Sequence, residues 1–205
     1  MPREPYNPLE KSHLGESVTK ALLVQPVRPL PPSEVFTGAG IYAIYYTSPF
    51  PAYRTLAKKN QDNRWAAPIY VGKAVPAGAR KGGYGLGEEP GEVLFRRLRE
   101  HAESIEQAEN LDLADFKCRY LIVDDIWIPL GESLLITMFS PLWNRQVDGF
   151  GNHDPGRGRY NQQRSSWDTD HPGRPWAVKL QPYSRDSGEI LRVAEKFLRT
   201  AGRKD

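Results

Sequence analysis

Two polar side chains on one amphipathic segment are the first residues of this sequence that could do chemistry. Arg97 and His101 are four residues apart within 92–109, where apolar residues recur at helical spacing. They therefore share a helix face, at the edge of the apolar stripe. An arginine there needs an anionic partner, because burying its charge alone is costly. The pair indicates either a phosphate-binding site or a structural ion pair.

A carboxylate on a second helical segment points in a similar direction. Glu132 opens 131–139 in register with Leu135, Ile136 and Phe139, so it faces the core with them. The helix dipole favours an acid in the first turn by about 0.3–1 kcal/mol, which explains its position along the helix but not its direction. A carboxylate in a cleft shared with an arginine and a histidine suits a hard cation such as Mg²⁺.

Two tyrosines complete the set of reactive side chains. Tyr42 and Tyr70 each lie in an apolar segment, where a tyrosine is ordinarily a core aromatic with a hydrogen-bonded hydroxyl. Gly40 precedes one and Gly72 follows the other, so the backbone can come close to a neighbour or a ligand at both places. Packing and chemistry both remain open for these tyrosines.

The elements that must position these side chains follow from the sequence periodicity. Segments rich in β-branched and aromatic residues predict strands over 40–46, 69–72 and 116–123. Helical spacing predicts helices over 17–23, 54–60, 92–109, 131–139 and 187–201. We expect 144–175 to be loop. The order β-β-α-β-α, with an arm at each end, predicts a small α+β domain.

Composition limits the class of protein. Among 205 residues there is one cysteine, Cys118, which excludes an intrachain disulfide, suits a reducing cytoplasm and is expected to be a small buried residue. No apolar run approaches the roughly 20 residues of a membrane helix, and the start lacks a signal-peptide pattern, so we expect a soluble cytoplasmic protein. The net charge of +3 does not by itself indicate a polyanionic partner.

The order of the candidate residues resembles the GIY-YIG nuclease superfamily. The tripeptide 40–42 (GIY) is followed by 70–72 (YVG), then by Arg97, Glu132 and Asn144, with valine where isoleucine is usual. Further stretches look like the type II restriction endonucleases that cut CCGCGG: 69–78, 110–120, 141–144, 147–156 and 171–177.

The resemblance implies an arrangement of the whole chain. Residues 38–146 would form a GIY-YIG core, with a small antiparallel sheet flanked by helices. Residues 1–37 would be an N-terminal arm that contacts DNA or a second subunit. Residues 147–205 would be a loop-rich extension and helix with DNA contacts.

The resemblance also implies roles for the tyrosines and their neighbours. Tyr42 would be the general base toward the attacking water, with His101 hydrogen-bonded to its hydroxyl. Only about 0.1% of free tyrosine is ionised at pH 7, so help is required, and Arg97, Lys73 and Mg²⁺ would favour the anion. Tyr70 would orient the scissile phosphate, and Arg97 would neutralise its developing charge.

Three further residues would support this chemistry. Glu132 would be the single protein ligand of a hydrated Mg²⁺ cofactor, for which Mn²⁺ can substitute. Asn144 would hold the site in shape, and Lys73 would contact a phosphate or a water. Their alternatives are a turn residue for Asn144 and a solvated loop charge for Lys73.

Basic residues in two loops could bind DNA. Donors for phosphates or guanine edges would come from Lys73, Arg80, Lys81, Arg157, Arg159 and Arg164. Cutting both strands of a palindrome implies a homodimer on DNA, and a restriction enzyme implies a cognate DNA methyltransferase. Acids are concentrated between Glu100 and Asp115, and we expect that helix end to face away from DNA.

The expected function is therefore Mg²⁺-dependent hydrolysis of DNA phosphodiester bonds at a palindromic G/C-rich site such as CCGCGG, giving double-strand breaks. Two alternatives stay open: a structure-specific repair or homing-type nuclease of the same superfamily, and a non-catalytic DNA-binding module. A His-Asn-His metal site built from His153, Asp154, Asn161 and His171 is disfavoured, because 153–171 lacks the strand-turn-helix pattern.

Overall fold

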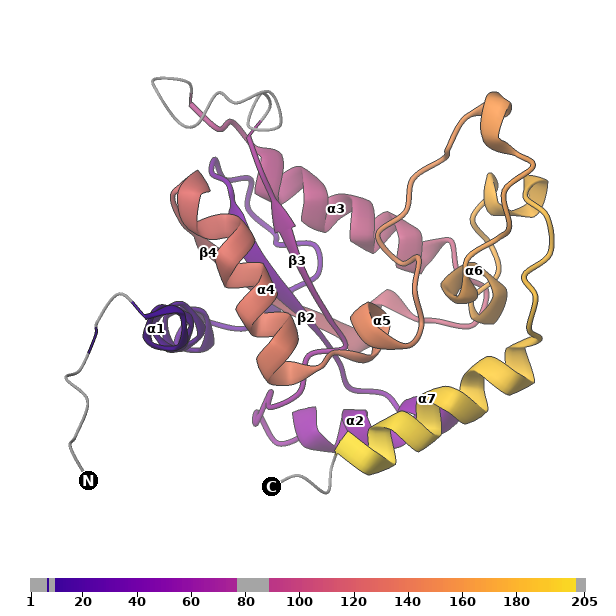
Figure 1. Cartoon of the computed structure of the whole chain (residues 1–205), viewed down its shortest axis with the longest axis horizontal. Coiled ribbons are helices and arrows are strands. Elements are labelled where there is room, and N and C mark those ends of the chain that lie inside the picture. Colours follow the sequence, from indigo (N-terminus) through magenta and orange to yellow (C-terminus); the bar gives the residue numbers. More distant parts are fainter. Residues whose placement is uncertain (1–6, 8–9, 77–88, 202–205) are drawn as a thin grey trace.

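A small antiparallel sheet lies at the centre of the chain (Figure 1). The computed structural model describes residues 7, 10–76 and 89–201, and within them the sheet has four strands. These are β1 (Arg28–Pro29), β2 (Gly40–Tyr46), β3 (Tyr70–Ala74) and β4 (Phe116–Ile122), in the order β1-β4-β2-β3. The predicted α+β class and the strand at 40–46 are confirmed.

The central strand β2 carries the sheet's most apolar sequence. It pairs with β3 on one edge and β4 on the other, and all of its residues are buried. Successive side chains point to opposite faces, so Tyr42, Ile44 and Tyr46 enter one core and Ile41 enters another. An uninterrupted apolar run is what a strand covered on both faces requires.

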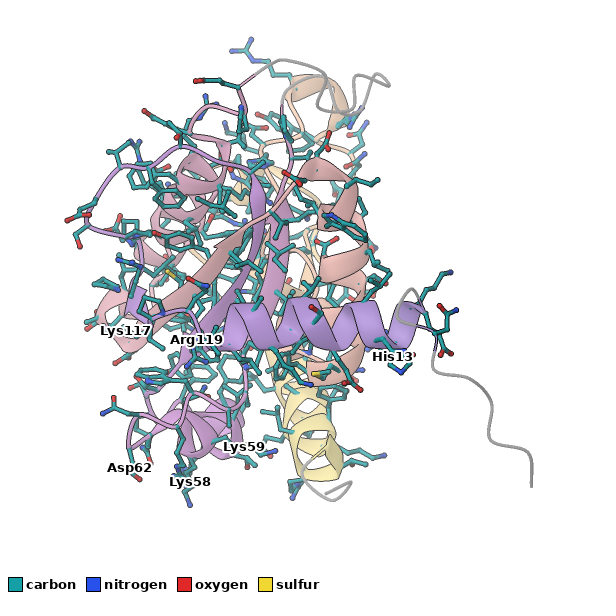
Figure 2. The ribbon with its side chains drawn as sticks, turned by 90° about the vertical axis from the view of Figure 1, so that its left-hand side faces the viewer. His13, Lys58, Lys59, Asp62, Lys117 and Arg119 are labelled. Atoms are coloured by element: carbon teal, nitrogen blue, oxygen red, sulfur yellow. The ribbon has the colours of Figure 1, made fainter. Side chains whose placement is uncertain are left out.

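Helices cover both faces of the sheet. The described helices are α1 (Lys11–Leu23), α2 (Arg54–Asn60), α3 (Val93–Glu106), α4 (Ile128–Phe139), α5 (Leu142–Arg145), α6 (Ser166–Asp170) and α7 (Ser187–Ala201). The core shared with α1 and α4 includes Leu22, Ile41 and Leu135, whereas α3 and α5 pack with Tyr42 on the other face. Figure 2 shows α1 lying across the sheet face that it shares with α4, with His13 at one end of the helix and Arg119 near the other end.

Two helices begin earlier than predicted, and the expected loop is partly helical. α1 starts at Lys11, and α4 starts at Ile128 with a proline in its first turn, where a missing N–H is harmless. α4 ends at Phe139, and the capping residue Ser140 that follows has a left-handed φ of 43°. Expecting loop over 144–175 was wrong at α5 and α6. α6 begins because the Ser165 hydroxyl accepts the backbone N–H of Asp168 at 3.1 Å.

The two ends of the described chain both join the core. β1 pairs with β4, and the buried Cys118 thiol donates to the Pro29 carbonyl at 3.2 Å, so Cys118 is a small buried residue as predicted. α7 has the bounds predicted from its periodicity and lies alongside α2 (Figure 1). None of the described helices is long and apolar enough to cross a membrane.

Candidate active site

Tyr42 and His101 form the buried centre of the site. The Tyr42 hydroxyl on β2 lies 2.6 Å from His101 Nε2 on α3, and both side chains are buried. Burial, followed by the charge of nearby Arg97, lowers the pKa of His101 well below its usual range, so the ring is neutral at pH 7. In the tautomer that carries its proton on Nδ1, the neutral ring accepts at Nε2, and the tyrosine hydroxyl donates to it.

Glycine at position 72 makes room for this hydroxyl. A Cβ on Gly72 would overlap the Tyr42 hydroxyl, which crosses over β3 from the neighbouring strand. Tyr70, two residues before that glycine, lies on the same side, with ring centroids 6.3 Å from Tyr42 and 5.2 Å from His101. Where the two tripeptides of the sequence meet, position 72 must therefore lack a side chain to leave room for the Tyr42 hydroxyl.

Burial controls the acidity of Tyr42. Burial first, then the neighbouring Tyr70, raises the pKa of Tyr42 well above its usual range, while the Arg97 guanidinium opposes the rise. The pKa of Tyr70 is also raised by burial. Arg97 thus lowers the pKa of Tyr42 as expected of a nearby cation, but the opposite effect of burial is larger.

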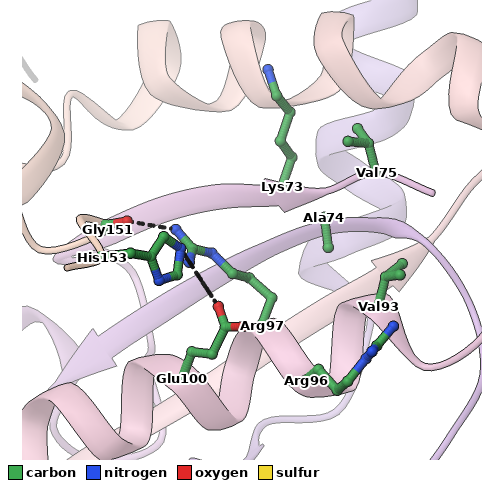
Figure 3. A pocket seen from close by; sticks show the side chains of 9 residues that line it. All are labelled: Lys73, Ala74, Val75, Val93, Arg96, Arg97, Glu100, Gly151 and His153. Atoms are coloured by element: carbon green, nitrogen blue, oxygen red, sulfur yellow. Dashed lines mark hydrogen bonds and ion pairs between the residues drawn. The ribbon is translucent and has the colours of Figure 1, made fainter. Parts of the chain in front are cut away.

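Arg97 is held in place by three partners. Its Nη1 donates to Glu100 Oε2 at 2.8 Å and lies 2.6 Å from His153 Nε2, while Nη2 donates to the Gly151 carbonyl at 2.9 Å (Figure 3). The structural ion pair that the sequence left open exists, with Glu100 as its acid. Glu100, the first of the acids between residues 100 and 115, lines the same cavity as Arg97, and the orientation of this helix end relative to DNA stays a prediction.

Lys73 and Glu132 lie on the other side of β3. Lys73 points from β3 toward α4 (Figure 3), and its Nζ is 2.7 Å from Glu132 Oε2. Successive side chains of β3 point to opposite faces of the sheet, so Lys73 and Tyr70 lie on different faces. The candidate residues are therefore divided between the two sides of this edge strand. The Glu132 carboxylate nonetheless acts on both Tyr42 and Tyr70, since its charge contributes to raising the pKa of each.

Asn144 fastens α5 to β3. Its Oδ1 accepts the Val71 N–H at 2.8 Å, and its Nδ2 donates to the Val71 carbonyl at 2.8 Å. β3 is the outer strand of the sheet, so the side chain satisfies backbone groups that a further strand would otherwise bind. Asn144 thereby fixes the strand that carries Tyr70.

A cavity of about 400 Å³ opens beside these residues. Its lining combines the cations Lys73, Arg96 and Arg97 with Glu100 and His153. Three cations on one open surface can hold a phosphodiester. The adjoining hollow of about 240 Å³ brings Tyr70 and Arg97 together with Asn144.

Glu132 fits a divalent cation bound mainly by water. It is a half-buried carboxylate beside the cavity's lysine, and the described residues contain no cluster of three or more metal-binding side chains. Mg²⁺ keeps several waters and often uses one carboxylate together with phosphate oxygens. A single carboxylate beside an open cavity fits that mode of Mg²⁺ binding.

Three further basic candidates, Arg157, Arg159 and Arg164, do not line this cavity. Arg157 and Arg159 are exposed on a short 3₁₀ turn, and Arg164 is half-buried. Arg80 and Lys81 lie outside the described residues. Loop 146–165 runs from α5 past α3 toward that 3₁₀ turn (Figure 1).

The two histidines of the disfavoured metal site have separate partners. His153 contacts Arg97, whereas buried His171 lies 2.7 Å from the Tyr53 hydroxyl and 2.9 Å from Asn110 Oδ1. His171 thus connects α6 to the core rather than joining His153.

Sequence reasoning missed several residues that surround Arg97. Besides Glu100 and His153, these are Arg96, Phe150 and Gly151. The likeness of 147–156 to the restriction enzymes was a usable signal for Phe150, Gly151 and His153, and helical i,i+3 spacing was one for Glu100.

A known protein family matches most of the chain. A family model described as the Eco29kI GIY-YIG domain matches residues 34–198, which include both tyrosine strands, α3, α4 and the extension up to α7. No curated protein matches the chain.

Proposed function

Because the chain belongs to the Eco29kI GIY-YIG family of restriction endonucleases, we propose that it is a Mg²⁺-dependent type II enzyme that cuts both DNA strands at CCGCGG. The observation that carries the proposal is the buried 2.6 Å hydrogen bond between Tyr42 and His101, beside Tyr70 and Arg97. If Tyr42 served only for packing, it would need neither a neutral His101 as hydrogen-bond partner nor the Arg97 guanidinium beside it.

Tyr42 activates the attacking water. Tyr42 first loses its own proton, through His101 Nε2 across the 2.6 Å bond and on to solvent. As the water oxygen forms its bond to phosphorus, the ionised Tyr42 oxygen takes the water's proton. The bond between phosphorus and the 3′ oxygen breaks, and the electron pair leaves with that oxygen.

Arg97 and Tyr70 stabilise the charge that develops on the phosphate. Arg97 keeps a fixed orientation through Gly151 and Glu100, so its donors are preorganised for an oxyanion. Tyr70 offers a hydroxyl whose raised pKa keeps it protonated and able to donate. Glu132 would hold the Mg²⁺, which when bound stabilises the leaving oxygen.

DNA recognition is assigned to the basic loops and to a second subunit. Arg157 and Arg159 are exposed and available for phosphates or guanine edges, and we extend the same role to Lys73 and Arg164. Cleavage of a palindrome by one site per subunit makes the active form a homodimer on DNA. A methyltransferase of the same specificity would protect the host's own sites.

A plasmid digest tests the proposal directly. Linear products should appear with Mg²⁺ and a single CCGCGG site, and disappear with chelator or with one base pair of the site changed. Sequencing the ends locates the cut. Glu132→Gln should abolish cleavage and leave DNA binding measurable, whereas Glu106→Gln, an exposed glutamate on α3, should cut normally.

Two outcomes would contradict the proposal. Cleavage only of branched or flapped DNA would indicate a repair-type nuclease. Tight binding without cleavage under any metal would indicate a DNA-binding module.

A further inference from the structure

Arg174, in the C-terminal extension, is buried although it carries a charge. It is 1% exposed, and its guanidinium lies 4.5 Å from the ring centre of Trp167 and 4.6 Å from that of Trp176. Its Nε donates to Asp168 Oδ1 at 2.6 Å. The charge is thus paired and enclosed between two aromatic faces, so Arg174 cannot contact DNA.

The other donors of this guanidinium hold one short loop. Nη1 donates to the carbonyls of Phe150 at 3.2 Å and Asn152 at 3.1 Å, and Nη2 donates to the carbonyl of Gly149 at 2.9 Å. Three carbonyls within four consecutive residues are therefore tied to one rigid planar group. The remaining carbonyl, of Gly151, is the one that accepts from Arg97.

Loop 149–152 touches three residues of the candidate active site. Besides the Gly151 contact with Arg97, the Phe150 ring stacks on His101 at 4.5 Å and meets the Tyr70 ring edge-on at 5.0 Å. A Cβ at Gly151 would lie 2.9 Å from the Tyr70 hydroxyl and 3.1 Å from Arg97 Nη2. The loop is packed so closely that a small displacement must move these side chains.

We propose that Arg174 is a positioning residue for DNA cleavage. By holding loop 149–152 against α3, it sets the orientation of Arg97 and the packing of His101 and Tyr70. The inference rests on the proposed function, because positioning matters only if these residues act on a phosphate. It adds a role for the C-terminal extension that does not involve contact with DNA.

The test compares Arg174→Lys with wild type and with Arg119→Lys. Lysine keeps the charge but cannot serve three carbonyls and a carboxylate together. Arg119 is a matched control, because it also donates to backbone carbonyls, of Gln25 and Trp65, but lies among the residues of the opposite sheet face. Measurements are the melting temperature, the Kd for cognate DNA without Mg²⁺, the single-turnover cleavage rate, and amide hydrogen exchange across 148–153.

We expect Arg174→Lys to bind DNA as wild type does but to cut on the order of 10²-fold more slowly, because misplacement by about 1 Å has that effect. Exchange across 148–153 should rise in this variant, and Arg119→Lys should cut normally even where its melting temperature falls. Asp168→Asn removes the charge partner and should give the same pattern, which covers the case in which Arg174→Lys fails to fold.

Three results would overturn the inference. A normal single-turnover rate in folded Arg174→Lys would show that the loop needs no such clamp. An equal loss of rate and affinity would make Arg174 a determinant of DNA binding. Unchanged amide exchange across 148–153 would show that Arg174 does not hold the loop. This measurement needs no cleavage activity, so it tests the inference even if the wild-type protein cuts no DNA, a result that would contradict only the proposed function.

Discussion

At the scale of single residues, Tyr42 decides how the site depends on pH. Free tyrosine is about 0.1% ionised at pH 7, and burial, which raises the pKa of Tyr42, makes its ionised fraction smaller still. Tyr42, the proposed general base, therefore works far below its pKa. Each rise of pH increases the ionised fraction in proportion.

Cleavage should accordingly accelerate with pH. Single-turnover rates are expected to rise by up to about tenfold per pH unit between roughly pH 6 and 9. The lowered pKa of His101 keeps that ring neutral across this pH range. Protonation of His101 therefore adds no second pH-dependent step to the rate profile. Tyr42→Phe should lower the rate by about 10²–10⁴-fold and flatten this profile while DNA binding persists. A plateau well below pH 8 in wild type would exclude Tyr42 as the titrating base.

At the scale of elements, Asn144 couples α5 to β3. Asn144→Ala removes both hydrogen bonds to Val71 and should lower the free energy of unfolding by about 1–3 kcal/mol. The cleavage rate should fall further than stability explains, because Tyr70 begins the same strand. Urea unfolding and single-turnover cleavage measure the two effects. Gln146→Ala, an exposed neighbour, should change neither.

His171, which connects α6 to the core, makes the free energy of unfolding depend on pH. Burial lowers the pKa of His171 to about 3, so below about pH 6.5 the unfolded chain binds a proton that the folded chain does not. Stability is therefore lost as pH falls from about 6.5 toward 3. His101 acts in the same direction, while Asp170, whose pKa burial raises to about 6, opposes it between about pH 6 and 3.8.

Urea unfolding at pH 7 and pH 5 tests this account. Wild type should be less stable at pH 5. His171→Gln should be less stable than wild type at pH 7, because it disturbs the bonds to Tyr53 and Asn110, but should lose less on acidification. If the free energy of unfolding fell by the same amount from pH 7 to pH 5 in wild type and in His171→Gln, His171 would not be the source of the pH dependence.

At the scale of the whole molecule, the net charge of +3 conceals separated charges. Three cations line the main cavity, and exposed arginines occupy 157–159, whereas most acids of 100–115 lie along and beyond the end of α3. Glu100 is the exception, because it forms an ion pair with Arg97 at 2.8 Å. A near-neutral chain can therefore bind DNA through local fields.

DNA affinity should fall steeply with added salt. Each phosphate neutralised contributes about −0.9 to the slope of log K against log salt concentration. Arg157→Ala should make that slope shallower by about 1 if the residue contacts a phosphate. Arg99→Ala is the control, because Arg99 is exposed and already paired with Glu103 on α3. Affinity that hardly responds to salt would contradict a phosphate-dominated interface.

Local patterns determined most of the elements. The strand at 40–46 and the helix at 187–201 have their predicted bounds, because period and composition depend only on neighbours along the chain. The order of Tyr42, Tyr70, Arg97, Glu132 and Asn144 was enough to indicate the family. The helices α5 and α6 escaped prediction because they are short and depend on a turn and a cap rather than on a period.

The tertiary structure alone decided which side chains meet. His153 contacts Arg97, Lys73 on β3 pairs with Glu132 on α4, and Arg174 holds the loop that touches the site. Most of these contacts join residues more than 20 positions apart. Sequence spacing fixes which face of an element a residue occupies, but only the packing of whole elements brings two such faces within hydrogen-bonding distance.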